Sequence, residues 1–267
     1  SAWCERKQTM IINLYKHRGY IWRTALAEVR TRYAGAGLGA LWNLLQPLSM
    51  ILVFTVIFTQ LMPRAGELGA PYPVYLCAAL LPWSAFGECI SRGTQAFITN
   101  AAYLRKMPIP EQVFVAQTAL ATAIGLTLSF ATLIVVAAAL GHYPSWHWLL
   151  LPGPLLLLIG LGFGLGMMLG TLNAFLRDVG QVVPIVLQVW FWLTPVVYPK
   201  SILSPTMRAV IEWNPVYPYM ESIRSLFITR ELPNASLWIA MLAWTIASSA
   251  LGYVVLRKLR PELRDVI

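Results

Sequence analysis

The longest apolar stretch of the chain lies between Glu111 and Arg177, where 65 residues pass without an Asp, Glu, Lys or Arg. A helix needs about 20 predominantly apolar residues to cross a hydrocarbon core of roughly 30 Å. The stretch is therefore long enough for two crossings and a turn. Helix-breaking, polar and aromatic residues at 141–147 place that turn at a membrane–water boundary. The pattern predicts an integral membrane protein.

Four further windows without charge are each long enough to cross. Glu88 closes the second of them early, but its apolar pattern continues to about Thr99. We therefore expect an all-α integral membrane protein with six transmembrane helices, forming a single permease domain over residues 1–267. The four windows are 33–63, 68–87, 179–199 and 232–256.

Composition agrees with this prediction, because 58% of the residues are hydrophobic and only 12% are charged. The net charge of +9 is distributed unevenly between the two sides of the predicted membrane. One side carries 14 basic residues, in the N-terminal segment, at 105–106, at 177 and in the C-terminal tail, and the other carries five. The positive-inside rule places both termini in the cytoplasm. Attraction to anionic lipid headgroups accounts for the basic excess without a nucleic acid partner.

Residues 16–33 have the periodicity of an amphipathic helix. Trp22, Leu26, Val29 and Tyr33 recur on one stripe, and basic residues fall mostly off it. We expect a helix along the cytoplasmic interface within an N-terminal segment, 1–33; a simple lipid anchor is the alternative.

The segment 200–231 is long and only half polar. It contains two amphipathic pieces, about 203–213 and 218–230, separated by Asn214-Pro215-Val216-Tyr217-Pro218. Irregular structure at membrane depth is tolerated only where it is buried in protein or lines a cavity. We predict two re-entrant half-helices that dip into the outer leaflet as part of a pore or gate.

Two features carry candidate chemistry. Glu88 and Arg92 are one helical turn apart, and within the membrane they must pair or line a wet cavity. This is either a structural pair or a cavity-lining one. The connection 100–111 is too apolar for a solvated loop, so Leu104, Met107 and Ile109 either dock on another protein or form an amphipathic turn.

Several functions lack their motifs. The sequence has no G-x-x-x-x-G-K-[ST] loop for ATP, no H-E-x-x-H and no G-x-S-x-G, and its three cysteines have no metal-ligand spacing. We therefore predict no catalytic, cofactor or metal site in this chain. Glycines at 160–170 form small-xxx-small pairs, which predict close helix packing.

The order of motifs resembles the inner-membrane permeases of ABC-type polysaccharide exporters. The resemblance covers nearly the whole chain and is strongest with the capsular polysaccharide branch; O-antigen and teichoic acid exporters are close relatives. Ile109 departs from the aromatic residue that the family often has there. The matching residues are Arg32-Tyr33, Leu38 to Trp42, Gln46-Pro47-Leu48, Leu81-Pro82-Trp83, Asn100, Leu104, Lys106, Pro108, Pro110, Arg177-Asp178, Phe191 to Pro199, Asn214 to Pro218, and Arg224.

The resemblance implies a homodimer in the bacterial inner membrane, with the polymer passing between the two copies. Each copy would bind a cytoplasmic ATPase subunit that holds ATP and Mg, and a periplasmic export partner is possible. The coupling residues would be Asn100, Tyr103, Leu104, Arg105, Lys106, Met107 and Pro108. The external gate would comprise Trp213, Asn214, Pro215, Tyr217, Pro218 and Tyr219.

Sugar polymers present ring faces that aromatic side chains hold without a fixed register. Candidate channel residues are Trp42, Phe54, Phe58, Glu88, Arg92, Trp190, Trp192 and Tyr198. For any single aromatic, a place in a lipid-facing belt or in packing is the more ordinary role. Arg23, Arg30 and Arg32 would recognise the phosphate of a lipid-linked substrate at a lateral opening, since the guanidinium fork matches phosphate oxygens.

We expect an ATP-driven exporter subunit for a lipid-linked capsular polysaccharide, with O-antigen or teichoic acid as the alternative substrate. An ion-coupled carrier would need more than the single intramembrane acid, Glu88, and matched internal repeats. A membrane enzyme would need a convergent polar cluster near one interface, which the sequence lacks.

Overall fold

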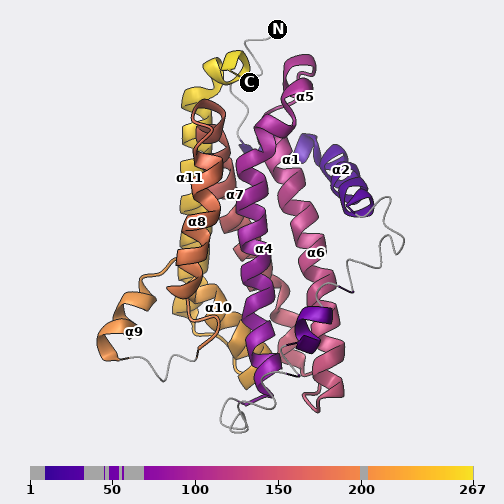
Figure 1. Cartoon of the computed structure of the whole chain (residues 1–267), viewed down its shortest axis with the longest axis vertical. Coiled ribbons are helices and arrows are strands. Elements are labelled where there is room, and N and C mark those ends of the chain that lie inside the picture. The colour runs from indigo at the N-terminus through magenta and orange to yellow at the C-terminus, as the bar shows by residue number, and fades with distance from the viewer. Residues whose placement is uncertain are drawn as a thin grey trace.

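A computed structural model describes residues 10–32, 45, 48–53, 56, 69–198 and 204–266, with side chains described as far as residue 263. Every regular element in these ranges is a helix. The long helices run side by side as an elongated bundle (Figure 1). They are α4 (Tyr72–Thr99), α6 (Gln112–Ala139), α7 (Pro152–Phe175) and α11 (Ala235–Val266). The predicted all-α class is confirmed.

Within the described ranges, four helical stretches are long and apolar enough to cross a membrane, one of them α7 with the preceding 3-10 turn Trp146–Leu150. They coincide with the second, third, fourth and sixth predicted spans. The predicted fifth span is the shorter α8 (Val179–Trp192), whose 14 residues extend only about 21 Å. Most of the predicted first span, 33–63, lies outside the described residues. The count of six spans stays a prediction.

Helix α7 packs against α4 and α11 through glycines, at backbone distance. A Cβ added to Gly164 would lie 2.4 Å from the backbone carbon of Ser248, and one added to Gly252 would lie 2.4 Å from the Gly164 oxygen. On the other side, Gly93 of α4 faces Gly166 at similar range. Small residues allow such approach where lipid tails provide no hydrophobic force between helices. The predicted close packing is confirmed.

The predicted amphipathic helix is divided into α1 (Met10–Lys16) and α2 (Arg18–Thr31), both packed against α6. Ile21 and Ala25 form its buried face, whereas Trp22 is half exposed. The buried stripe is therefore displaced by one position from the one that we predicted. Burial of the small Ala25 lets α2 approach α6 closely, and the larger Trp22 remains on the outer surface.

One end of the bundle carries the short helix α5 (Ala101–Lys106), and we call it the α5 end. The opposite end carries α9 (Pro205–Glu212), α10 (Tyr217–Arg224) and the π-helical turn Ser225–Thr229 (Figure 1), and we call it the α10 end. Two short helices were predicted here, and two are present. Helix α10 is buried against α4, α7 and α11, while α9 extends away from the bundle. Whether they enter a membrane stays a prediction.

Candidate functional site

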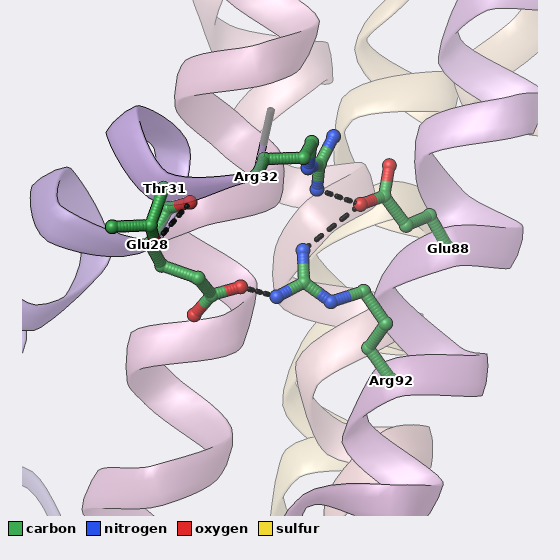
Figure 2. Close-up of a pocket in the computed structure, with 5 residues that line it drawn as sticks. All are labelled: Glu28, Thr31, Arg32, Glu88 and Arg92. Atoms are coloured by element: carbon green, nitrogen blue, oxygen red, sulfur yellow. Dashed lines mark hydrogen bonds and ion pairs between the residues drawn. The ribbon is translucent and has the colours of Figure 1, made fainter. Parts of the chain in front are cut away.

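Four charged side chains from two helices meet beside the bundle (Figure 2). On α4, Arg92 Nη1 lies 2.9 Å from Glu88 Oε1, so the predicted pair within the helix is confirmed. Arg92 also pairs with Glu28 of α2, and Arg32 pairs with Glu88. We call these four residues the charge cluster. Together with Thr31 they line an open pocket of about 350 Å³.

The charge cluster has no net charge, and each side chain is about 30% exposed to solvent. Ion pairs in such a wet pocket contribute little stability, because water and salt screen them. Their geometry matters more than their energy. Glu28 of α2 and Arg32, directly after that helix, form ion pairs with Arg92 and Glu88 of α4, so the cluster connects α2 to α4.

Of the three arginines predicted at the lateral opening, only Arg32 belongs to the charge cluster. Arg23 and Arg30 are exposed on α2. Glu28 was not predicted as a site residue. A signal for it exists in the sequence, since Glu28 precedes Arg32 by four residues just as Glu88 precedes Arg92.

The predicted channel aromatics have different surroundings. Trp190 packs edge-on against Trp83 and Phe86, with ring centroids 6.2 and 5.6 Å away. This packing role was not predicted from the sequence for Trp83 or Phe86. Trp192 is 61% exposed, and Tyr198 donates a hydrogen bond to its carbonyl. Trp42, Phe54 and Phe58 lie outside the described residues. A role for any of these side chains in a channel stays a prediction.

Trp190 also lines a pocket of about 420 Å³ between α4, α7 and α8. Apart from Asp178, the other lining residues are aliphatic. Such a surface suits an acyl chain or a packed helix better than a hydrated sugar, because it offers almost no hydrogen-bonding groups.

Asn214 holds the α10 end together. Its Oδ1 accepts from Trp190 Nε1 at 2.9 Å and from the Val216 amide, and its Nδ2 donates to Leu193 O and Thr194 Oγ1. All four capacities of this side chain are used, so the end of α8 is fixed to the start of α10. Of the other predicted gate residues, Tyr217, Pro218 and Tyr219 are buried, Pro215 is half-buried, and Trp213 is exposed.

Arg224 is a buried cation that sequence reasoning did not place in the site. Its guanidinium donates to Pro195 O and Val196 O, and it lies over the Tyr75 ring. Tyr72 donates to the next carbonyl, Val197 O, at 2.9 Å. Burial lowers the pKa of Arg224, and Tyr75 and the nearby Glu221 oppose this shift. The available signal was a single basic residue in the largely apolar segment 216–228, one turn from the acid Glu221.

The predicted coupling residues divide into inward and outward groups. Leu104 is 1% exposed and packs with Phe97 and Phe114 of its own chain, and Ile109 packs against the same cluster. These two aliphatic residues therefore support the segment from within, and a role for them in docking on another protein stays a prediction. Asn100 is partly buried and donates to Ala96 O, and Pro108 is exposed. Tyr103, Arg105, Lys106 and Met107 face outward.

The described residues contain no group of three or more His, Cys, Asp or Glu side chains that would hold a metal ion. In the charge cluster, both acids are matched by arginines.

Comparison with known proteins supplies the family. The model of the ABC-2 type transporter family matches residues 20–228. An O-antigen export system permease protein, RfbA of Myxococcus xanthus, is 28% identical over 264 residues, covering 97% of this chain and 99% of that protein. RfbA of Klebsiella pneumoniae is 25% identical over 97% of this chain and 100% of its own length. The polysialic acid transport protein KpsM of Escherichia coli is 26% identical over 74% of this chain and 77% of its own. The chain belongs to the ABC-2 type transporter family, as a transmembrane permease subunit.

Proposed function

We propose that this chain is the permease of an ATP-driven exporter of a lipid-linked O-antigen polysaccharide. The observation that carries the proposal is the end-to-end similarity to O-antigen export permeases, over 97% of this chain and 99% of the Myxococcus protein. The polysialic acid transport proteins KpsM match a shorter part of the chain. We therefore prefer O-antigen to the capsular polysaccharide that motif order alone favoured.

Energy would come from a separate ATPase, since the sequence has no phosphate-binding loop for ATP. Two ATPase subunits would dock on the α5 ends of a homodimer in the bacterial inner membrane, with both termini cytoplasmic. The outward group of Tyr103, Arg105, Lys106 and Met107 is the proposed contact surface. The polymer would pass between the two copies, and the α10 end would form the external gate.

The charge cluster is the proposed point at which the lipid-linked substrate enters. Its pocket is open, and its two guanidinium groups have a geometry that suits phosphate oxygens. Glu28 and Glu88 neutralise these groups while no substrate is bound. A phosphate that arrives would compete with the two carboxylates for the arginines, and this competition would loosen α2 from α4.

The proposal can be tested by comparing the export of O-antigen with the export of capsular polysaccharide. The chain and its cognate ATPase would be expressed in one strain that lacks its O-antigen permease and in another that lacks its capsular permease. We expect surface O-antigen to be restored, dependent on an active ATPase. Restoration of capsule alone would contradict the choice of substrate. Export by the purified permease in liposomes with only an ion gradient would contradict ATP-driven transport.

A second comparison tests the lateral opening. Arg32→Ala should lower export, because Arg32 belongs to the charge cluster. Arg23→Ala changes an exposed arginine of α2 that was predicted for the same role but lies outside the cluster, and it should lower export less. Normal export by Arg30→Ala/Arg32→Ala at native expression levels would rule out recognition at this helix.

A further inference from the structure

A buried carboxylate is the last residue of the proposed coupling segment, 100–111. Glu111 precedes the first residue of α6, and none of its side chain is exposed. Its Oε2 lies 2.8 Å from Nε of Arg260, near the end of α11, and Arg260 is 37% exposed. The pair connects two parts of the chain that are far apart in sequence. Neither residue was predicted as a site residue.

The helices that carry the pair also share a hydrophobic cluster. Leu104 of α5, Phe114 of α6, and Leu256 and Leu263 of α11 are all at most 1% exposed and belong to one hydrophobic cluster. A carboxylate is expensive to bury unless a cation and further hydrogen bonds compensate for the lost water. Arg260 therefore fixes where the end of α11 lies relative to the coupling segment, and any displacement of that segment must move Arg260 or break the pair.

Helix α11 continues from this point toward the α10 end. Met241 and Arg260 are 19 positions apart, which corresponds to about 28 Å of helix. Along this length α11 is held against α7 at backbone distance, at Gly164 and Ser248. A helix packed so closely on its neighbour moves as a unit more readily than it bends.

At its other end α11 meets the external segment. The hydroxyl of Tyr219 in α10 donates to Met241 O at 2.7 Å and lies 2.8 Å from Thr245 Oγ1. Thr245 in turn donates to Leu157 O of α7 at 3.0 Å. A shift of α11 would therefore displace α10, which carries buried residues of the predicted gate.

We infer that Glu111 and Arg260 are positioning residues that transmit movement of the coupling segment into α11 and, through Tyr219, to α10. This inference rests on the proposed function, because it assumes that an ATPase acts on residues 100–111. Movement of the coupling segment can also pass directly from α5 into α4, because the two helices are consecutive in the chain. The inferred route through α11 is a second path for the same movement.

The test uses the complete complex of permease and cognate ATPase in liposomes, with polymer export and ATP hydrolysis measured together. Arg260→Gln and Glu111→Gln should each lower the polymer exported per ATP hydrolysed by at least about fivefold, the lower end of typical coupling effects. The double variant should be no worse than either single one, because the two residues act as one unit. Arg260→Lys, which keeps the charge, should restore most of the ratio. Arg257→Gln, exposed on the same helix, is the matched control.

The ratio separates positioning from simple stabilisation. Loss of folded complex would lower export and hydrolysis together and leave their ratio unchanged, and that result would overturn the inference. Equal ratios in wild type and Arg260→Gln would also overturn it. A wild-type complex that hydrolyses ATP without exporting polymer would instead contradict the proposed function, so the two failures are distinguishable.

Discussion

The guanidinium carbon of Arg224 lies 4.1 Å from the centroid of the Tyr75 ring, so a cation of α10 is stacked on an aromatic side chain of α4. The same guanidinium donates to the carbonyls of Pro195 and Val196, in the turn that follows α8. One side chain thus joins three elements at the α10 end. The contacts replace the water that a buried cation loses, which explains how a charge persists in this apolar core.

Replacement of Arg224 by Met should destabilise the protein by about 3 kcal/mol, because two buried carbonyls lose charge-assisted donors. Unfolding in detergent, followed by tryptophan fluorescence, would measure the change. Arg230→Met is the matched control, since Arg230 is exposed and donates to one carbonyl, Tyr143 O. Equal stability of the two variants would show that the buried contacts of Arg224 are not what holds this end together.

Gly164→Ala should separate α7 from α11, since the new methyl group would lie 2.4 Å from backbone atoms of Ser248 and Ser249. Overpacking of this kind costs about 1–3 kcal/mol. Thermal unfolding would report it as a lower midpoint. Gly19→Ala on α2 has no atom within 4 Å of the added carbon and should leave the midpoint unchanged or slightly raised. A Gly164→Ala variant as stable as wild type would be inconsistent with the backbone contact.

The charge cluster predicts opposite effects for its acids and bases. Glu28→Gln removes a carboxylate that occupies Arg92, so it should tighten binding of a long-chain lipid phosphate, while Arg92→Gln should weaken it. Native mass spectrometry of the purified permease with that lipid would measure both. Glu262→Gln, an exposed acid of α11, provides the same change of charge elsewhere. Weaker binding by Glu28→Gln would mean that Glu28 assists the ligand rather than competes with it.

Reversal of charge on α5 should weaken association with the ATPase. Arg105 and Lys106 are exposed at the α5 end, so Arg105→Glu/Lys106→Glu places two acids on the proposed contact surface. Co-purification of the ATPase would fall, and more steeply at low salt. Arg208→Glu/Arg230→Glu makes the same change at the α10 end and should leave co-purification intact. Undiminished association of the α5 variant would place the ATPase elsewhere.

Sequence analysis located the membrane character and most of the long helices, since an apolar run of 20 or more residues leaves little alternative to a membrane helix. It was less successful in predicting which face of a helix is buried and how long each helix is. The buried stripe of α2 was displaced by one position, and α8 is shorter than the apolar window that predicted it. Periodicity describes how one helix could pack, but the neighbouring helix decides which side chains are buried.

The amino-acid sequence by itself determined a helical membrane protein, the close packing at its glycines, the Glu88–Arg92 pair and two short helices broken at Asn214-Pro215. Only the tertiary structure brought Glu28 to Arg92, Arg224 to Tyr75 and Glu111 to Arg260. The physical reason is the distance along the chain over which each interaction acts. Helix propensity, hydrophobicity and pairs one turn apart act between neighbours in the chain, whereas these three contacts join helices whose relative placement depends on how every other helix packs.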